Sequence, residues 1–186
     1  YSGAKGWLIG EANKGLAAMF TMMNSARLNV GLEGVGVAEA ALQVAVGYAR
    51  DRKQGSAPGT DGSAPIIRHP DIQRSLATMA ANVQVARAIC YACGAAAEIA
   101  EHHPDAAMRK AAKLREDLLT PLAKAWSTDA AVEAANTGVQ IHGGMGFMAE
   151  TAAAQLYLDA RILPIYEGTN GIQAMDLVGR KLSMDN

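Results

Sequence analysis

Apolar residues recur at three- and four-residue steps over most of this chain, which is the spacing of one buried face of an α-helix. A first helix is expected over residues 15–50, with an inward stripe of Leu28, Leu32, Val35, Leu42, Val46 and Ala49. A second is expected over residues 70–102, with a stripe of Ile72, Leu76, Met79, Val83, Ala86, Cys90, Cys93, Ala97 and Ala100. A third is expected over residues 105–138, with Leu118, Leu122, Ala125 and Val132 inward.

The remaining segments predict short connections and shorter helices. Residues 52–65 are rich in Gly, Ser, Ala and Pro and predict an exposed loop. After a glycine cluster at residues 143–146, helices are expected near 151–160 and 169–182, separated by a bend. Three glycines in the first helix, Gly31, Gly34 and Gly36, suggest close approach of another backbone. The sequence therefore predicts an all-α, up-and-down helical bundle.

Composition supports helices and excludes some partners. Half of the 186 residues are hydrophobic but only 5% are aromatic, a balance that favours close-packed helices over strands. The formal net charge is −1 and the basic residues are dispersed, so nothing points to nucleic acid or to an anionic membrane. We expect no apolar run long enough to span a bilayer, and a cytoplasmic location by default.

The first residues suggest that the chain is a fragment of a longer protein. The run Gly-Trp-Leu-Ile-Gly at residues 6–10 has the pattern of a strand end entered from upstream. We therefore assign residues 1–14 to the end of a preceding β domain and its linker. Residues 15–186 form the expected helical domain.

Two candidate chemical motifs have simpler explanations. Cys90 and Cys93 could form at most half of a zinc site, and both fit the apolar stripe of the second helix, so we expect core packing and no metal site. Gly143, Gly144 and Gly146 do not fit the dinucleotide-binding fingerprint and predict a turn, although they permit close approach of a ligand.

Glu167 lies between apolar residues at a bend before the last expected helix. Partial desolvation there could raise its pKa toward the range that a general base needs. It could equally begin the last helix, where a negative charge interacts favourably with the helix dipole. The residues alone leave both interpretations open.

Several segments together resemble the acyl-CoA dehydrogenase family. They occur in the family's order and cover nearly the whole chain: residues 6–11, 22–42, 48–52, 140–147 and 158–173. The most specific are the Gln-x-x-Gly-Gly-x-Gly-Phe loop, which begins at Gln140, and the Tyr-Glu-Gly-Thr run, which begins at Tyr166. The ending, residues 167–182, looks closest to a subgroup of longer polypeptides that includes 3-methylthiopropanoyl-CoA dehydrogenases.

The resemblance implies roles for particular residues. Glu167 would be the catalytic base, because Ala26 occupies the position that carries the base in some other members. The substrate-binding positions would be Asn24, Arg27 and Gly168. The FAD-binding positions would be Thr169 and Asn170 in the same subunit and Arg52, Gln140, Gly143 and Gly144 toward the FAD of a neighbouring subunit.

The reaction implied by the resemblance is α,β-dehydrogenation of an acyl-CoA thioester, with Glu167 taking the α-proton and the flavin accepting the hydride. An electron-transfer flavoprotein would receive the electrons, within fatty acid metabolism, and the enzyme would be a homodimer or homotetramer. An acyl-CoA oxidase on the same fold and a non-catalytic helical oligomerisation module are the alternatives. The 186 residues by themselves are expected to be inactive.

Overall fold

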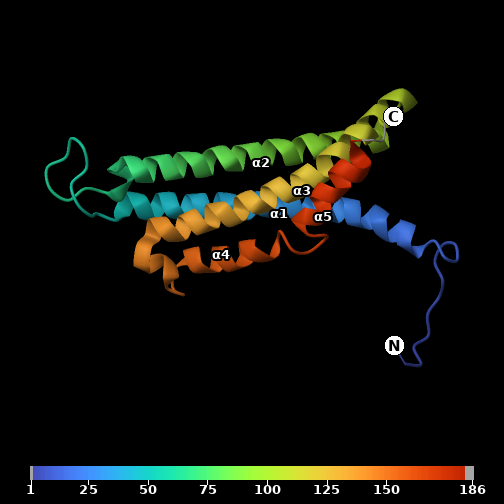
Figure 1. Cartoon of the computed structure of the whole chain (residues 1–186), viewed down its shortest axis with the longest axis horizontal. Coiled ribbons are helices and arrows are strands. Elements are labelled where there is room, and N and C mark those ends of the chain that lie inside the picture. Colours follow the sequence, from blue (N-terminus) through green and yellow to red (C-terminus); the bar gives the residue numbers. More distant parts are fainter. Residues whose placement is uncertain (1, 183–186) are drawn as a thin grey trace.

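The computed structural model describes residues 2–182, and its regular elements are helices (Figure 1). Their bounds are α1 Gly15–Asp51, η1 Ile66–Arg68, α2 Pro70–His102, α3 Ala106–His142, η2 Gly143–Phe147, α4 Ala152–Ile162, α5 Asn170–Asp176 and η3 Leu177–Lys181. Over the described range no strand forms, and β-type pairing is limited to an isolated bridge between Lys53 and Pro65. The predicted all-α fold is therefore confirmed.

The three long helices lie side by side, and α3 packs against both α1 and α2 (Figure 1). The shorter α4 packs on α3 and α1, and α5 packs on α3. Residues 2–14 precede α1 without regular structure, and Trp7, Leu8 and Ile9 are exposed. Because a strand needs a partner strand to pair with, the expected β-strand end at residues 6–10 stays a prediction. Residues 183–186 of the predicted domain lie outside the described range.

The buried face of α1 agrees with the predicted stripe only in part, because Val35 and Ala49 are buried but the leucines are not. Leu32 is 38% exposed, whereas Val30, Ala38, Ala41 and Ala45 are buried. The face that meets α3 is made mainly of alanine and glycine, because small side chains let two helix backbones approach closely. The large apolar residues of α1 flank this seam instead of forming its centre.

Close backbone contact is confirmed at two of the three glycines. A Cβ atom on Gly31 would lie 2.8 Å from the carbonyl oxygen of Ala123, and one on Gly34 would lie 2.7 Å from that of Ser127. Either atom would force the two helices apart. The same expectation is wrong for Gly36, which is exposed and has no neighbour within 4 Å of a built Cβ.

The predicted stripe of α2 is confirmed for most of its length, from Leu76 to Cys93. Both cysteines are free and buried, and burial raises the pKa of each thiol. The Cys90 sulfur lies 3.3 Å from the Ser127 hydroxyl oxygen, so it packs and hydrogen-bonds within the core. Throughout residues 2–182 no group of three or more metal-ligating side chains comes together.

The inward face of α3 was predicted wrongly. Leu118 and Leu122 are exposed, while Lys124, Ser127 and Thr128 are fully buried. Polar side chains can be buried on this face because they hydrogen-bond to α2 and to the first residue of α5. A rule that places leucines inside and lysines outside fails at such a position.

The expectation that no run could span a bilayer was too strict. By length and composition, α1 and α2 both could cross a membrane, a test that core helices of soluble proteins also pass. In this fold each of them packs one face against α3.

Candidate functional site

The loop between α4 and α5 has an unusual backbone at Glu167. This residue has φ +54°, in the left-handed region that glutamate rarely adopts, and the next residue, Gly168, has φ +84°. A non-glycine residue in that region costs on the order of 1 kcal/mol, and such strain is concentrated at functional sites. A Cβ atom on Gly168 would also lie 2.9 Å from the Gln173 amide nitrogen. Residues 166–170 are called the Glu167 corner below.

Two buried side chains hold the backbone of this corner. The Arg27 Nε donates to the Glu167 carbonyl oxygen over 3.4 Å. The Gln173 Nε2 donates to the carbonyl oxygens of Glu167 and Gly168, over 3.4 and 3.1 Å. Arg27 is only 4% exposed and Gln173 only 1%. The strained backbone is therefore fixed from α1 and from α5 together.

The buried charge of Arg27 is balanced within the chain. Its Nη1 lies 3.5 Å from a carboxylate oxygen of Asp176 and 3.3 Å from the Asn24 side-chain oxygen. Asp176 also accepts a hydrogen bond from Arg180 over 2.6 Å. The structure therefore brings together Asn24, Arg27 and Gly168, the three positions predicted to bind substrate. Arg27 is therefore a buried arginine inside the bundle and does not lie on the surface of this chain.

Thr169 and Asn170 occupy the start of α5. The Thr169 hydroxyl oxygen accepts from the Ile172 backbone N–H over 3.3 Å, so this residue is the N-cap of α5. The side chain of Asn170 turns toward α3, where its oxygen accepts from the Lys124 Nζ and its nitrogen donates to Asp129, over 2.9 and 2.7 Å. The predicted contacts of both residues with a cofactor stay predictions.

Lys124 also contributes to this site, although the sequence patterns did not single it out. Its side chain has no exposed surface. Its pKa is lowered to about 8, mainly by desolvation; the charge of Arg27 adds to the shift, and those of Asp129 and Glu167 oppose it. The signal that could have identified it is its place between Ala123 and Ser127 on the small-residue face of α3.

Tyr166 connects the Glu167 corner to α1. Its hydroxyl donates a short hydrogen bond to a carboxylate oxygen of Glu33. Desolvation, with a further contribution from this bond, raises the pKa of Tyr166 to about 12. Glu33 was not among the predicted site residues, and its position on the flank of α1 gave no signal in the helical pattern.

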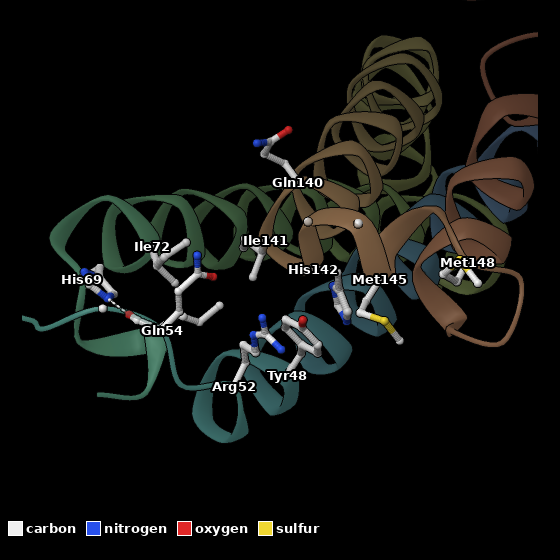
Figure 2. A pocket seen from close by; sticks show the side chains of 14 residues that line it. Tyr48, Arg52, Gln54, His69, Ile72, Gln140, Ile141, His142, Met145 and Met148 are labelled. Carbon is white, nitrogen blue, oxygen red and sulfur yellow. Dashed lines mark hydrogen bonds between the residues drawn. The ribbon is translucent and has the colours of Figure 1, made fainter. Parts of the chain in front are cut away.

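A separate pocket of about 850 Å³ lies where α1 ends, α2 begins and η2 follows α3 (Figure 2). We call it the glycine-loop pocket; it contains all four residues predicted to face a neighbouring subunit's FAD, namely Arg52, Gln140, Gly143 and Gly144. Figure 2 shows the side chains of Arg52 and Tyr48 next to each other on the same side of α1.

The wall of this pocket is built by the turn that follows α3. Gly143 has φ +60°, and a Cβ atom on Gly146 would lie 2.4 Å from the Val139 carbonyl oxygen, so both positions require glycine. The buried His142 ring stacks on Tyr48 with 4.3 Å between ring centroids, and its Nδ1 lies 2.7 Å from the Gly138 carbonyl oxygen. These contacts fix the glycine turn against the end of α1.

The two sites lie far apart along α1. Arg27 is at the Glu167 corner and Arg52 is at the C-cap of the same helix, 25 residues further on (52 − 27). At 1.5 Å per residue the separation is roughly 37 Å. One chain therefore carries two separate candidate sites, the Glu167 corner and the glycine-loop pocket.

Comparison with known proteins places this arrangement in a family. Residues 13–182 match the family model described as "Acyl-CoA dehydrogenase, C-terminal domain". A 3-methylmercaptopropionyl-CoA dehydrogenase of Ruegeria pomeroyi is 54% identical over all of this chain and 32% of its own length. A butyryl-CoA dehydrogenase of Syntrophomonas wolfei is 36% identical over 96% of this chain and 30% of its own length.

Solved structures agree with the sequence relatives. An acyl-CoA dehydrogenase complexed with FAD from Bacillus anthracis aligns with a TM-score of 0.80 and 32% identity, covering 93% of this chain and 30% of that one. Butyryl-CoA dehydrogenase from Megasphaera elsdenii aligns with a TM-score of 0.73 and 30% identity, over 93% of this chain and 40% of that one. The chain spans about a third of the length of the curated relatives described here. It belongs to the acyl-CoA dehydrogenase family and corresponds to the C-terminal helical domain.

Proposed function

We propose that the protein containing this chain catalyses FAD-dependent α,β-dehydrogenation of an acyl-CoA thioester, with Glu167 as the base that removes the α-proton. The observation that carries the proposal is the backbone of Glu167, which has φ +54° and is fixed through its carbonyl oxygen by Arg27 and Gln173. Strain maintained by two buried side chains favours a functional role over a simple helix start, which needs no positive φ.

The carboxylate of Glu167 is free to react. Among residues 2–182, no side chain donates a hydrogen bond to it, and the residue is only half-buried. A general base must reach the proton it takes and must change its protonation state during the reaction. A group fixed through its backbone and unbound at its carboxylate meets both conditions.

The residues of the glycine-loop pocket fit a bound FAD. The pocket is lined by the Arg52 cation and by Gln140. A Cβ built on either Gly143 or Gly144 meets nothing within 4 Å, which leaves open space beside the backbone for a ligand. Arginine suits anionic phosphate groups, and the volume lies within the usual range for ligand sites. FAD bound by the enzyme would supply the acceptor for the hydride that leaves the β-carbon.

The separation of roughly 37 Å along α1 supports two cofactor contacts per chain. In this proposal the Glu167 corner serves the active site of its own subunit. The glycine-loop pocket holds the FAD of a neighbouring subunit, so the enzyme is a homodimer or homotetramer. We further propose a cytoplasmic enzyme whose electron acceptor is an electron-transfer flavoprotein.

The substrate proposal rests on the relatives. We infer that short acyl-CoA thioesters, including 3-methylmercaptopropionyl-CoA, are the first to test, because the relative with 54% identity carries that name. A panel should compare this thioester with straight-chain acyl-CoAs of increasing length. Oxygen consumption during turnover would separate an oxidase from a dehydrogenase.

The test uses the full-length protein that contains this chain. Anaerobic bleaching of the flavin's visible absorbance by acyl-CoA is measured for the wild type, for Glu167→Gln and for Glu98→Gln. The first substitution keeps the side-chain shape and removes the base. The second is the matched control, because the Glu98 side chain is 75% exposed on α2.

We expect bleaching in the wild type and in Glu98→Gln, and its loss in Glu167→Gln with FAD still bound. Fast bleaching in Glu167→Gln would mean that Glu167 only begins the last helix. Absence of bleaching in the wild type with every thioester would favour a non-catalytic helical module.

A further inference from the structure

Lys124 is a buried cation that the proposed reaction does not use. Its side chain has no exposed surface, in the middle of α3. An ammonium group inside a protein is unfavourable unless it is hydrogen-bonded and lies near compensating charge. The contacts that stabilise it therefore indicate what it does.

The Lys124 ammonium group donates to the side-chain oxygen of Asn170 over 2.9 Å. On the other side of the same amide, the Asn170 nitrogen donates to Asp129 over 2.7 Å and to the Ala125 carbonyl oxygen over 3.2 Å. The cation binds the oxygen end of the amide, and the carboxylate binds the nitrogen end. Lys124 and Asp129, together with the Thr128 hydroxyl that lies 3.3 Å from the amide oxygen and 3.0 Å from the amide nitrogen, therefore fix the orientation of the Asn170 side chain.

Asn170 in turn closes the loop that contains Glu167. Its backbone N–H donates to the Pro164 carbonyl oxygen over 3.1 Å, which joins the two ends of the segment 164–170. Glu167 lies in the middle of that segment. A rotation or displacement of Asn170 would open the loop and move the strained backbone of Glu167.

We propose that Lys124 is a positioning residue for Glu167 and acts through its hydrogen bond to Asn170. The inference rests on the proposed function, because it assigns to Lys124 the task of holding the reacting carboxylate in place. Displacing a reacting group by about 1 Å can slow a reaction roughly a hundredfold. Loss of Lys124 therefore lowers kcat more than it weakens substrate binding.

Three variants of the full-length, FAD-loaded protein test this. Lys124→Met removes both the hydrogen bond and the charge while keeping a long, flexible side chain. Lys124→Gln removes the charge but keeps an N–H group that can donate to Asn170. Lys110→Met is the matched control, since Lys110 is exposed on the same helix.

In anaerobic bleaching with acyl-CoA, Lys124→Met should lose about tenfold or more in the rate at saturating substrate, while KM changes less than about threefold. Lys124→Gln should recover part of the lost rate, and Lys110→Met should match the wild type. A wild-type rate in Lys124→Met overturns the proposal. Equal losses in Lys124→Gln and Lys124→Met also overturn it, because the hydrogen bond would then not be what matters.

A second measurement is independent of turnover. Hydrogen–deuterium exchange of the segment 164–173 should be faster in Lys124→Met than in Lys110→Met, while exchange in the middle of α2 stays the same. Unchanged exchange in the segment overturns the positioning role. If none of the acyl-CoAs bleaches the flavin of the wild-type protein, the proposed function fails. The exchange result still decides whether Lys124 fixes the Glu167 corner.

Discussion

The Nε atom of Arg27 lies 3.4 Å from the carbonyl oxygen of Glu167, which joins two residues 140 positions apart in the chain. The contact fixes the candidate base through its backbone and leaves its carboxylate unbound. It requires a buried cation, and Asp176, with its side chain 3% exposed, supplies the balancing charge. The geometry of Glu167 therefore depends on an ion pair inside the bundle.

Arg27→Met should destabilise the protein, because Asp176 would lose a partner inside the fold. Removing one member of a buried ion pair costs about 3–5 kcal/mol, although Arg180 still pairs with Asp176 and reduces the effect here. The melting temperature of the full-length protein should fall clearly. A second variant, Arg27→Met with Asp176→Leu, should recover part of the loss. A melting temperature in Arg27→Met equal to that of the wild type would contradict this account.

The seam between α1 and α3 gives a prediction with an internal control. Gly34→Ala should destabilise the protein by roughly 1–3 kcal/mol, because the new methyl group would lie 2.7 Å from the Ser127 carbonyl oxygen. Gly36→Ala, on the exposed face of the same helix, should stabilise it by up to about 1 kcal/mol through helix propensity. Thermal melts of the two variants should therefore shift in opposite directions. Equal shifts would mean that helix propensity alone decides both.

The sequence predicted the helices well because their apolar spacing is a local property. The first half of the α2 stripe could be predicted because its buried residues there, Leu76, Met79 and Val83, are large and apolar. On α3 the same rule failed, since Leu118 is exposed and Lys124 is buried. Burial of Lys124 depends on an acceptor 46 residues away, and no local pattern reports such a partner.

In the candidate sites, too, local motifs could be identified from the sequence, whereas contacts between distant segments could not. The segment from Gln140 to Gly144 was identified from a short motif, and these residues do line one pocket together with Arg52. The supports of Glu167 were not identified as a set, because Gln173 contacts Glu167, and Asp176 contacts Arg27, only once α5 has packed on the bundle. The positive φ of Glu167 is likewise a property of the folded loop.

The proposed cofactor role of Arg52 can be tested against its neighbour Arg50. Arg52 lines the glycine-loop pocket, whereas Arg50 is exposed and outside it. Arg52→Ala in the full-length protein should weaken FAD binding about tenfold, the size of a charged hydrogen bond, and Arg50→Ala should not. Titration of the apoprotein with FAD, followed by fluorescence, measures both. Equal affinities in the two variants would argue against a phosphate contact at Arg52.

The lowered pKa of Lys124 links the stability of the fold to pH. In the folded state the ammonium loses its proton near pH 8, whereas in the unfolded chain it does so near its ordinary pKa of 10.5. Between these values the unfolded chain binds more protons, so this group makes the fold more stable as pH rises. Tyr166 acts in the opposite direction at higher pH, since its pKa is raised to about 12 and the folded state retains the proton.

Comparison with Lys124→Met isolates the lysine, because Tyr166 and the buried thiols titrate in both proteins. As pH rises from 8 to 10, the melting temperature of the wild type should increase relative to that of Lys124→Met, corresponding to about 2 kcal/mol in the free energy of unfolding. Below pH 7 the difference between the two proteins should stop changing, since Lys124 is then charged in both states. Lys110→Met, at an exposed position of the same helix, should run parallel to the wild type over the whole range. A constant difference between Lys124→Met and the wild type from pH 7 to 10 would show that the buried ammonium keeps its proton, and desolvation would then not dominate its environment.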